Sequence, residues 1–311
     1  MRRQVSTHPF SLGWLVAALL VAGSGLEAVA KDTLPKVRRK AEHKVVDATD
    51  DAEVAKLLPK LLKRYDTPKK CEKLLQVLRK RSYPSRVPGR ITLEHACTDG
   101  KTREFTILAP SKYSKRKPTA VLVFLHCAVS QPPPGGGANE AGMFAPAVRD
   151  LDPIVVGPST YSRVGWDEPA CRELVHHALD VVKQHYNVDE NRVWLAGDSD
   201  GGRGTYAILE TGATFFAAAV PVIGAPGGVT RFLNLRNVPL FAINGETDTT
   251  FPVEHVRPLV EGMQALGIDL VYKEIAGKGH DPRFFLTYQD EICEFLAAHP
   301  REPFPQTVHW Q

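Results

Sequence analysis

The sequence predicts an α/β fold, in which a mostly parallel sheet carries helices on both faces and follows a small helical N-terminal segment. Two observations predict the sheet. From residue 90 onward, short runs of β-branched and apolar residues alternate with segments of helical periodicity. Most of these runs are apolar throughout, which is typical of strands buried on both faces. Such alternation favours parallel strands joined by helical crossovers.

The composition is that of a globular protein, but charge is unevenly distributed along the chain. Of 311 residues, 43% are hydrophobic and 24% are charged, which excludes collagen-like, coiled-coil and wholly disordered chains. The net charge of +4 combines 2 basic and 1 acidic residue in 1–30, 18 basic and 8 acidic residues in 31–90, and 19 basic and 26 acidic residues in 91–311. The basic segment 31–90 and the acidic segment 91–311 therefore need separate explanations.

The first 30 residues have the pattern of a secretory signal. Arg2 and Arg3 precede an apolar run, Leu12–Ala22, and small residues lead up to Ala30. We expect cleavage after Ala30 and a secreted or periplasmic protein. An uncleaved anchor is the alternative, but the run is shorter than the roughly 20 residues that a spanning helix needs. No later stretch is long and apolar enough to span a membrane. The five cysteines of the mature part permit at most two disulfide bridges.

Residues 31–89 are predicted to form a basic helical segment. Apolar residues recur at spacings of three and four between Asp51 and Arg81, and Pro68 should divide this stretch into two helices. The positive charge permits a contact with an anionic envelope polymer, lipid headgroup or nucleic acid. We favour a small helical cap with a solvated basic face, because a run of charge alone is weak evidence, and we expect no nucleic-acid partner. Unchanged retention on an anionic polymer after deletion of residues 31–88 would remove the binding hypothesis.

Residues 90–311 are predicted to form one domain. It opens with an antiparallel hairpin, Ile91–Cys97 and Arg103–Leu108, around a turn at 98–101. Buried strands follow at Ala120–Leu125, Pro153–Val156, Arg192–Ala196, Ala217–Val222, Val238–Ile243 and Leu270–Ile275, and helices at Cys171–Tyr186, Gly202–Leu209, Val253–Leu266 and Phe284–Ala298. Gln131–Met143, which contains the proline- and glycine-rich Pro132–Gly137, is expected to be a loop. The tail Phe304–Trp310 alternates apolar and polar residues and is compatible with an added edge strand.

Three polar residues each follow one of these strands, where the sites of open α/β sheets lie. Ser199 is the centre of a G-x-S-x-G sequence between a strand and a helix, Asp248 follows Val238–Ile243, and His280 follows Leu270–Ile275. A serine needs a base to become a nucleophile, and the base needs a carboxylate to orient it. The order Ser, Asp, His therefore predicts a catalytic triad, with Glu246 as the fallback acid.

The chain at this point resembles the α/β-hydrolase superfamily, and within it exported esterases related to polyhydroxybutyrate depolymerases, feruloyl esterases and dienelactone hydrolases. The resemblance covers about residues 90–300. It rests on Phe124-Leu-His126, Trp166, Val188-Asp189-x-x-Arg192-Val, Gly197-Asp-Ser-Asp-Gly-Gly202, Gly245-x-x-Asp248 and Gly279-His280. It implies Ser199 as nucleophile, His280 as base, Asp248 as its orienter and an oxyanion hole that includes the Asp200 amide. It also suggests Trp166 as an acyl-pocket residue, with a core tryptophan as the alternative.

Two positions depart from the family pattern. Cys127 stands where a glycine usually follows the histidine, so we expect the second oxyanion donor to be the amide of Ala128, with that of Cys127 as the alternative. Asp198 and Asp200 bracket the serine, and negative charge there opposes a developing oxyanion. Asp200 is tolerable if it points away and pairs with Arg203.

These features predict a secreted serine hydrolase that cleaves small or polymeric carboxylic esters through an acyl-Ser199 intermediate. Two alternatives stay open: a prolyl-oligopeptidase-like serine peptidase, although about sixty preceding residues cannot supply the usual propeller, and a catalytically impaired fold that binds polysaccharide or envelope. We expect no cofactor, because no G-x-G-x-x-G follows a strand, and no metal site, because His176, His177 and His185 on one helix lack an H-E-x-x-H pattern.

Overall fold

The computed structural model describes residues 34–35, 40–46, 51–79, 82–84, 87, 89–128, 136–160, 165–227, 232–303 and 305–309. The predicted signal sequence lies outside these residues. The described residues divide into two compact units, one formed by those between positions 37 and 82 and the other by residues 34–35 and those from position 83 onward. Among the helices described, none has the length and apolar character needed to cross a membrane.

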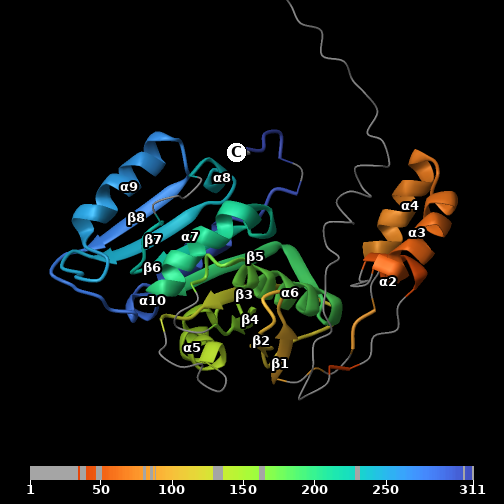
Figure 1. The fold of residues 1–311 in the computed structure, drawn as a ribbon, viewed down its shortest axis with the longest axis horizontal. Helices are drawn as coiled ribbons and strands as arrows, with labels where there is room; N and C mark the ends of the chain where they lie inside the picture. Colours follow the sequence, from red (N-terminus) through yellow and green to blue (C-terminus); the bar gives the residue numbers. More distant parts are fainter. Residues whose placement is uncertain are drawn as a thin grey trace, which may run out of the picture. The chain divides into compact units, whose positions relative to one another are not determined.

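The first unit is a cluster of three helices (Figure 1). They are α2 (Ala41–Val46), α3 (Asp51–Arg64) and α4 (Pro68–Arg79). The two longer helices are separated just before Pro68, which confirms the predicted division. Their apolar stripes bury Val45, Leu61 and Tyr65. The Tyr65 hydroxyl donates to a carboxylate oxygen of Glu42 over 2.9 Å, which ties α2 to the end of α3.

The second unit is built on one eight-stranded sheet with the order β1-β2-β4-β3-β5-β6-β7-β8. The predicted hairpin is confirmed: β1 pairs with β2 antiparallel, and β2 pairs with β4 antiparallel. All remaining pairs are parallel. The strands are β1 (Arg90–Ala96), β2 (Thr102–Leu108), β3 (Thr119–Leu125), β4 (Ile154–Pro158), β5 (Val188–Asp198), β6 (Ala218–Val222), β7 (Leu240–Gly245) and β8 (Leu270–Ile275).

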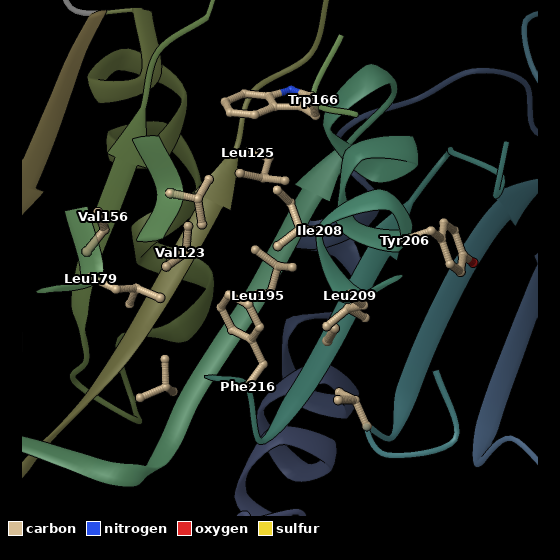
Figure 2. Close-up of a cluster of buried hydrophobic side chains, with 14 of the residues drawn as sticks. Val123, Leu125, Val156, Trp166, Leu179, Leu195, Tyr206, Ile208, Leu209 and Phe216 are labelled. Atoms are coloured by element: carbon tan, nitrogen blue, oxygen red, sulfur yellow. The ribbon is translucent and has the colours of Figure 1, made fainter. Parts of the chain in front are cut away.

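Helices cover both faces of this sheet, as predicted. Alternate residues of β3 enter two separate apolar clusters: Val123 and Leu125 enter one, while Leu122 and Phe124 enter the other. The first cluster is closed by α6 (Pro169–His185), α7 (Asp200–Gly212) and α9 (Val253–Ala265), and part of it is drawn in Figure 2. The second is closed by α5 (Gly136–Phe144), the 3-10 turn Ala145–Val148, α10 (Phe284–Thr287) and α11 (Gln289–Ala298). Short turns Ala213–Phe215 and α8 (Phe232–Leu235) complete the described elements.

Three predictions about the elements were wrong. The expected loop Gln131–Met143 contains most of α5, because the small residues that look like loop sequence let the helix approach the sheet: a Cβ on Gly137 would collide with the Pro158 backbone. The expected helix Phe284–Ala298 is interrupted at Tyr288. In the tail, described residues 305–309 form no strand, and the His309 amide donates instead to the Asn237 side chain over 2.9 Å.

All five cysteines, which lie in the described part of the chain, are free thiols, so neither of the two permitted disulfide bridges is present.

Candidate active site

Ser199 occupies a sharp turn between β5 and α7. The strand ends at Asp198 and the helix begins at Asp200, which leaves Ser199 with φ 53° and ψ −115°. A non-glycine residue rarely adopts a positive φ, and such backbone strain concentrates at functional sites. The Ser199 amide donates to the Val222 carbonyl over 3.0 Å. The turn requires glycine at position 201. A Cβ there would collide with the Leu125 carbonyl, and α7 could then not pass this close to β3.

The three side chains predicted to work together form one hydrogen-bonded chain. His280 Nε2 lies 2.9 Å from Ser199 Oγ, and His280 Nδ1 lies 2.7 Å from Asp248 Oδ2. Residues far apart in the sequence meet here because β5, β7 and β8 end at the same edge of the sheet. The buried carboxylate accepts a hydrogen bond from Nδ1–H, which leaves Nε2 free to accept a proton from the serine hydroxyl.

Asp248 is held by the loop that follows β7. It is 4% exposed, and its second oxygen, Oδ1, accepts the amides of Thr250 at 2.7 Å and Phe251 at 2.9 Å. The Phe251 ring also stacks on the His280 ring, with centroids 5.9 Å apart. Glu246, the fallback acid, accepts the Gly277 amide at 2.7 Å and so braces the loop after β8 rather than contacting the histidine.

Asp200 points toward a cation, which offsets its negative charge beside the nucleophile. Its Oδ1 lies 3.2 Å from Arg203 Nε, and Arg203 also contacts Asp167 over 3.1 Å. Because Asp200 is the first residue of α7, its amide has no carbonyl partner within the helix and can serve an external acceptor.

The Cys127 amide is already engaged. It donates to Glu140 Oε2 over 2.8 Å, and the Cys127 thiol donates to Glu140 Oε1 over 2.8 Å. Glu140 belongs to α5, and it holds the turn after β3 in place where a relative would have glycine. Ala128, the next residue, is exposed, and its amide has no partner among the described residues. The Cys127 amide is therefore already hydrogen-bonded, and the role of the Ala128 amide as second oxyanion donor stays a prediction.

Trp166 supports the site from within the core. It is fully buried, packs in the first apolar cluster near Leu125 (Figure 2), and donates from Nε1 to the His126 carbonyl over 3.0 Å. This burial favours the alternative of a core tryptophan, and a contact of Trp166 with an acyl group stays a prediction. His126 itself accepts the Thr160 amide at Nε2 over 2.9 Å, so Nδ1 carries the proton and donates to the Cys127 carbonyl.

Burial sets the electrostatics beside the nucleophile. Asp198 is 2% exposed, and burial together with the Glu140 charge raises the pKa of its carboxyl to about 8. Burial and the hydrogen bond to Glu140 raise the pKa of the Cys127 thiol. Burial lowers the pKa of His126, which keeps its imidazole neutral. The side chains behind Ser199 therefore carry less negative charge than the number of acidic residues there suggests.

Sequence reasoning missed Glu140 and Phe251. Glu140 lies in the segment that was predicted to be a loop, and no motif marks it. Phe251 follows Asp248 by three residues, and a hydrophobic residue near a loop acid has no distinguishing pattern. Both acquire their positions only from the packing of α5 and of the loop after β7.

Comparisons with known proteins bear on the fold of this chain. No protein-family model matches the chain. A bifunctional acetylxylan esterase/xylanase, XynS20E of Neocallimastix patriciarum, is 29% identical over 164 residues, which are 50% of this chain and 23% of that protein. The match therefore spans about a quarter of the length of that relative.

Several solved structures share the fold. A thermostable esterase superposes with a TM-score of 0.60 at 22% identity, over 68% of this chain and 64% of that one. A ferulic acid esterase has a TM-score of 0.51 at 18% identity, over 67% and 96% of the two chains. S-formylglutathione hydrolase (FrmB) of Staphylococcus aureus has a TM-score of 0.53 at 15% identity, over 70% and 98%. The chain has the α/β-hydrolase fold of these enzymes.

Proposed function

We propose that the protein is a serine hydrolase that cleaves carboxylic esters through an acyl-Ser199 intermediate. The observation that carries the proposal is the unbroken hydrogen-bonded chain from Asp248 through His280 to Ser199, with the serine on a strained turn. A serine hydrogen-bonded to a histidine, which is in turn hydrogen-bonded to a buried carboxylate, is the arrangement that activates a serine for nucleophilic acyl transfer.

In the first step, His280 Nε2 takes the Ser199 proton as Oγ attacks the ester carbonyl carbon. Asp248 stabilises the resulting imidazolium through Nδ1. The tetrahedral intermediate places negative charge on the former carbonyl oxygen, and the amides of Asp200 and Ala128 are the proposed donors to it. His280 then protonates the leaving alcohol. In deacylation, His280 activates a water molecule, which releases the acid and restores the serine.

The geometry around the two departures from the family pattern supports an active enzyme over an impaired binding module. Arg203 offsets the charge of Asp200, and Glu140 fixes the turn at Cys127. Peptidase action uses the same triad, so it remains the second candidate, and peptide substrates belong in the assay.

The substrate class is proposed from the relatives. The name of one relative gives an acetyl ester of xylan as its substrate, and the name of one solved structure gives an ester of ferulic acid. We propose an acetyl or feruloyl ester carried on a carbohydrate, and export through cleavage after Ala30 to reach it. Amino-terminal sequencing of protein secreted by the native host checks the cleavage.

The proposal is tested with p-nitrophenyl esters of graded chain length, feruloyl esters, acetylated xylan and peptide anilides. We expect ester hydrolysis that Ser199→Ala lowers by at least about 10⁴-fold. A fluorophosphonate probe should label the parent protein and leave Ser199→Ala unlabelled. Undiminished hydrolysis in Ser199→Ala contradicts the mechanism, and a folded parent protein that resists the probe favours the binding module.

A further inference from the structure

A second cluster of reactive groups lies behind the nucleophile. It consists of Cys127 after β3, Glu140 on α5 and Asp198 at the end of β5. One potential ligand atom of each residue lies within 4.8 Å of the corresponding atom of the other two. The three elements that supply them are fixed by the sheet and by α5, so the cluster does not depend on long flexible side chains.

Hydrogen bonding within the cluster leaves one buried atom without a partner. Glu140 accepts both the amide and the thiol of Cys127, each over 2.8 Å. Asp198, by contrast, is 2% exposed, and its Oδ1 has no hydrogen-bond partner. A buried carboxylate oxygen without a donor or a cation carries a substantial desolvation cost. Asp198 faces a second carboxylate, which adds repulsion instead of relieving this cost.

We propose that Cys127, Glu140 and Asp198 bind a divalent cation of the zinc class. One thiolate and two carboxylates are a suitable set of three ligands for Zn²⁺, which takes a water molecule at its fourth position. Mg²⁺ and Ca²⁺ are excluded as occupants because they require about six or more oxygen ligands and do not favour sulfur. Cys127 and Glu140 are each half-buried, so a cation reaches the cluster from their side.

Binding replaces protons with the metal. The cation takes the Cys127 sulfur as thiolate, so the thiol proton leaves to solvent, and any proton held between the two carboxyl groups leaves with it. The thiol–carboxylate hydrogen bond is exchanged for coordination of both groups to one ion. The local charge changes little, but Asp198 Oδ1 gains a partner.

In the other cluster of this composition, His95, Cys97 and Glu173, the unpartnered buried atom is a histidine nitrogen, His95 Nδ1, and not a carboxylate oxygen. Glu173 Oε1 lies 2.8 Å from His95 Nε2, and Glu173 Oε2 accepts the Thr98 amide over 2.9 Å. Its carboxylate oxygens therefore already have donors, and a cation would have to displace them. This difference makes the cluster behind Ser199 the stronger candidate.

The proposed cation site lies next to the residues proposed for catalysis. Asp198 precedes Ser199, and Cys127 precedes Ala128, so a cation here would join the two backbone segments on either side of the proposed oxyanion site. This consequence rests on the proposed function, whereas cation binding itself does not.

The test uses the full chain with its thiols kept reduced by a phosphine, and Co²⁺ as a spectroscopic probe for the zinc site. We expect one equivalent of Co²⁺ per chain, a thiolate-to-cobalt charge-transfer band, and displacement of the band by Zn²⁺ but not by Mg²⁺ or Ca²⁺. Cys127→Ser should abolish the band, and Asp198→Asn should weaken Zn²⁺ binding at least tenfold by calorimetry.

Cys293→Ser is the matched control, because Cys293 is also half-buried and its thiol donates to a carbonyl, that of Ala147, outside the cluster. It should keep the band and the affinity. A parent protein that binds no Co²⁺ overturns the proposal, as does a band that persists in Cys127→Ser or disappears in Cys97→Ser instead. If Cys127→Ser does not fold, Glu140→Gln replaces it and should weaken Zn²⁺ binding while keeping the band. Since every readout is binding, failure here is distinct from failure of ester hydrolysis.

Discussion

At the scale of single residues, the site depends on which nitrogen of each histidine carries a proton. His280 donates from Nδ1 to Asp248, so Nε2 faces Ser199 as an acceptor. The Asp248 carboxylate is itself oriented by the Thr250 and Phe251 amides, and these amides fix the plane of the carboxylate and, through it, the imidazole ring.

Replacement of the Asp248 carboxylate by an amide tests this orientation. Asp248→Asn keeps the shape of the side chain, but its NH₂ group cannot accept the Nδ1 proton and so favours the wrong tautomer. We expect kcat for an ester to fall by about 10⁴-fold with little change in KM. Kinetics of the purified variant measure this, and Glu246→Gln is the control. A comparable loss in Glu246→Gln alone would assign the orienting carboxylate to Glu246.

Arg203 tests the electrostatics on the other side of the serine. Arg203→Met leaves the Asp200 carboxylate uncompensated near the developing oxyanion, so kcat/KM should fall about tenfold, which corresponds to about 1.4 kcal/mol. Arg203→Lys keeps the positive charge and should lose less. Steady-state kinetics at low and moderate ionic strength check both variants, and the deficit of Arg203→Met should shrink as salt screens the charge. Equal rates in the two variants would show that this charge has no role.

At the scale of elements, the close approach of α7 to β3 sets the nucleophile turn. The first turn of α7 can lie against the end of β3 only because Gly201 lacks a side chain. The motif therefore needs glycine at position 201 for the close packing of two elements. It does not need glycine there for backbone conformation, since Gly201 has no positive φ.

A matched pair of glycine substitutions in two helices separates packing from helix propensity. Gly201→Ala should lower the free energy of unfolding by about 1–3 kcal/mol or more, because its Cβ meets backbone that cannot yield. Gly262→Ala in α9 meets open space and should raise it by about 0.5–1 kcal/mol. Urea denaturation measures both. Equal effects of the two substitutions would contradict the close approach.

At the scale of the whole molecule, a partly buried histidine couples stability to pH. Burial, and then the neighbouring His95, lower the pKa of His177 to about 4. In the unfolded chain the imidazole titrates near 6.5, so between about pH 6.5 and 4 the unfolded state binds more protons. The contribution of His177 to stability is therefore present above about pH 6.5 and is lost as pH falls toward 4.

Stability should accordingly decrease from pH 7 to pH 4, and His177→Gln should reduce this slope, by an amount on the order of 3 kcal/mol across the interval. Denaturant midpoints at half-unit steps of pH measure the effect. His255→Gln is the control, because His255 is exposed. A slope that is the same in His177→Gln and in the parent protein would show that His177 is not responsible.

The sequence by itself determined the α/β class, the hairpin and parallel strands, the division before Pro68 and the candidates Ser199, Asp248 and His280. It could do so because strand alternation and the residues after strand ends are local patterns, and because parallel strands end at one edge. Only the tertiary structure decided that Trp166 is a core residue, that Gln131–Met143 contains a helix, and that Glu140 meets Cys127 and Asp198. Those facts depend on contacts between elements far apart in the sequence, such as α5, β3 and β5. Residue spacing within one segment does not show which side chains such contacts bring together.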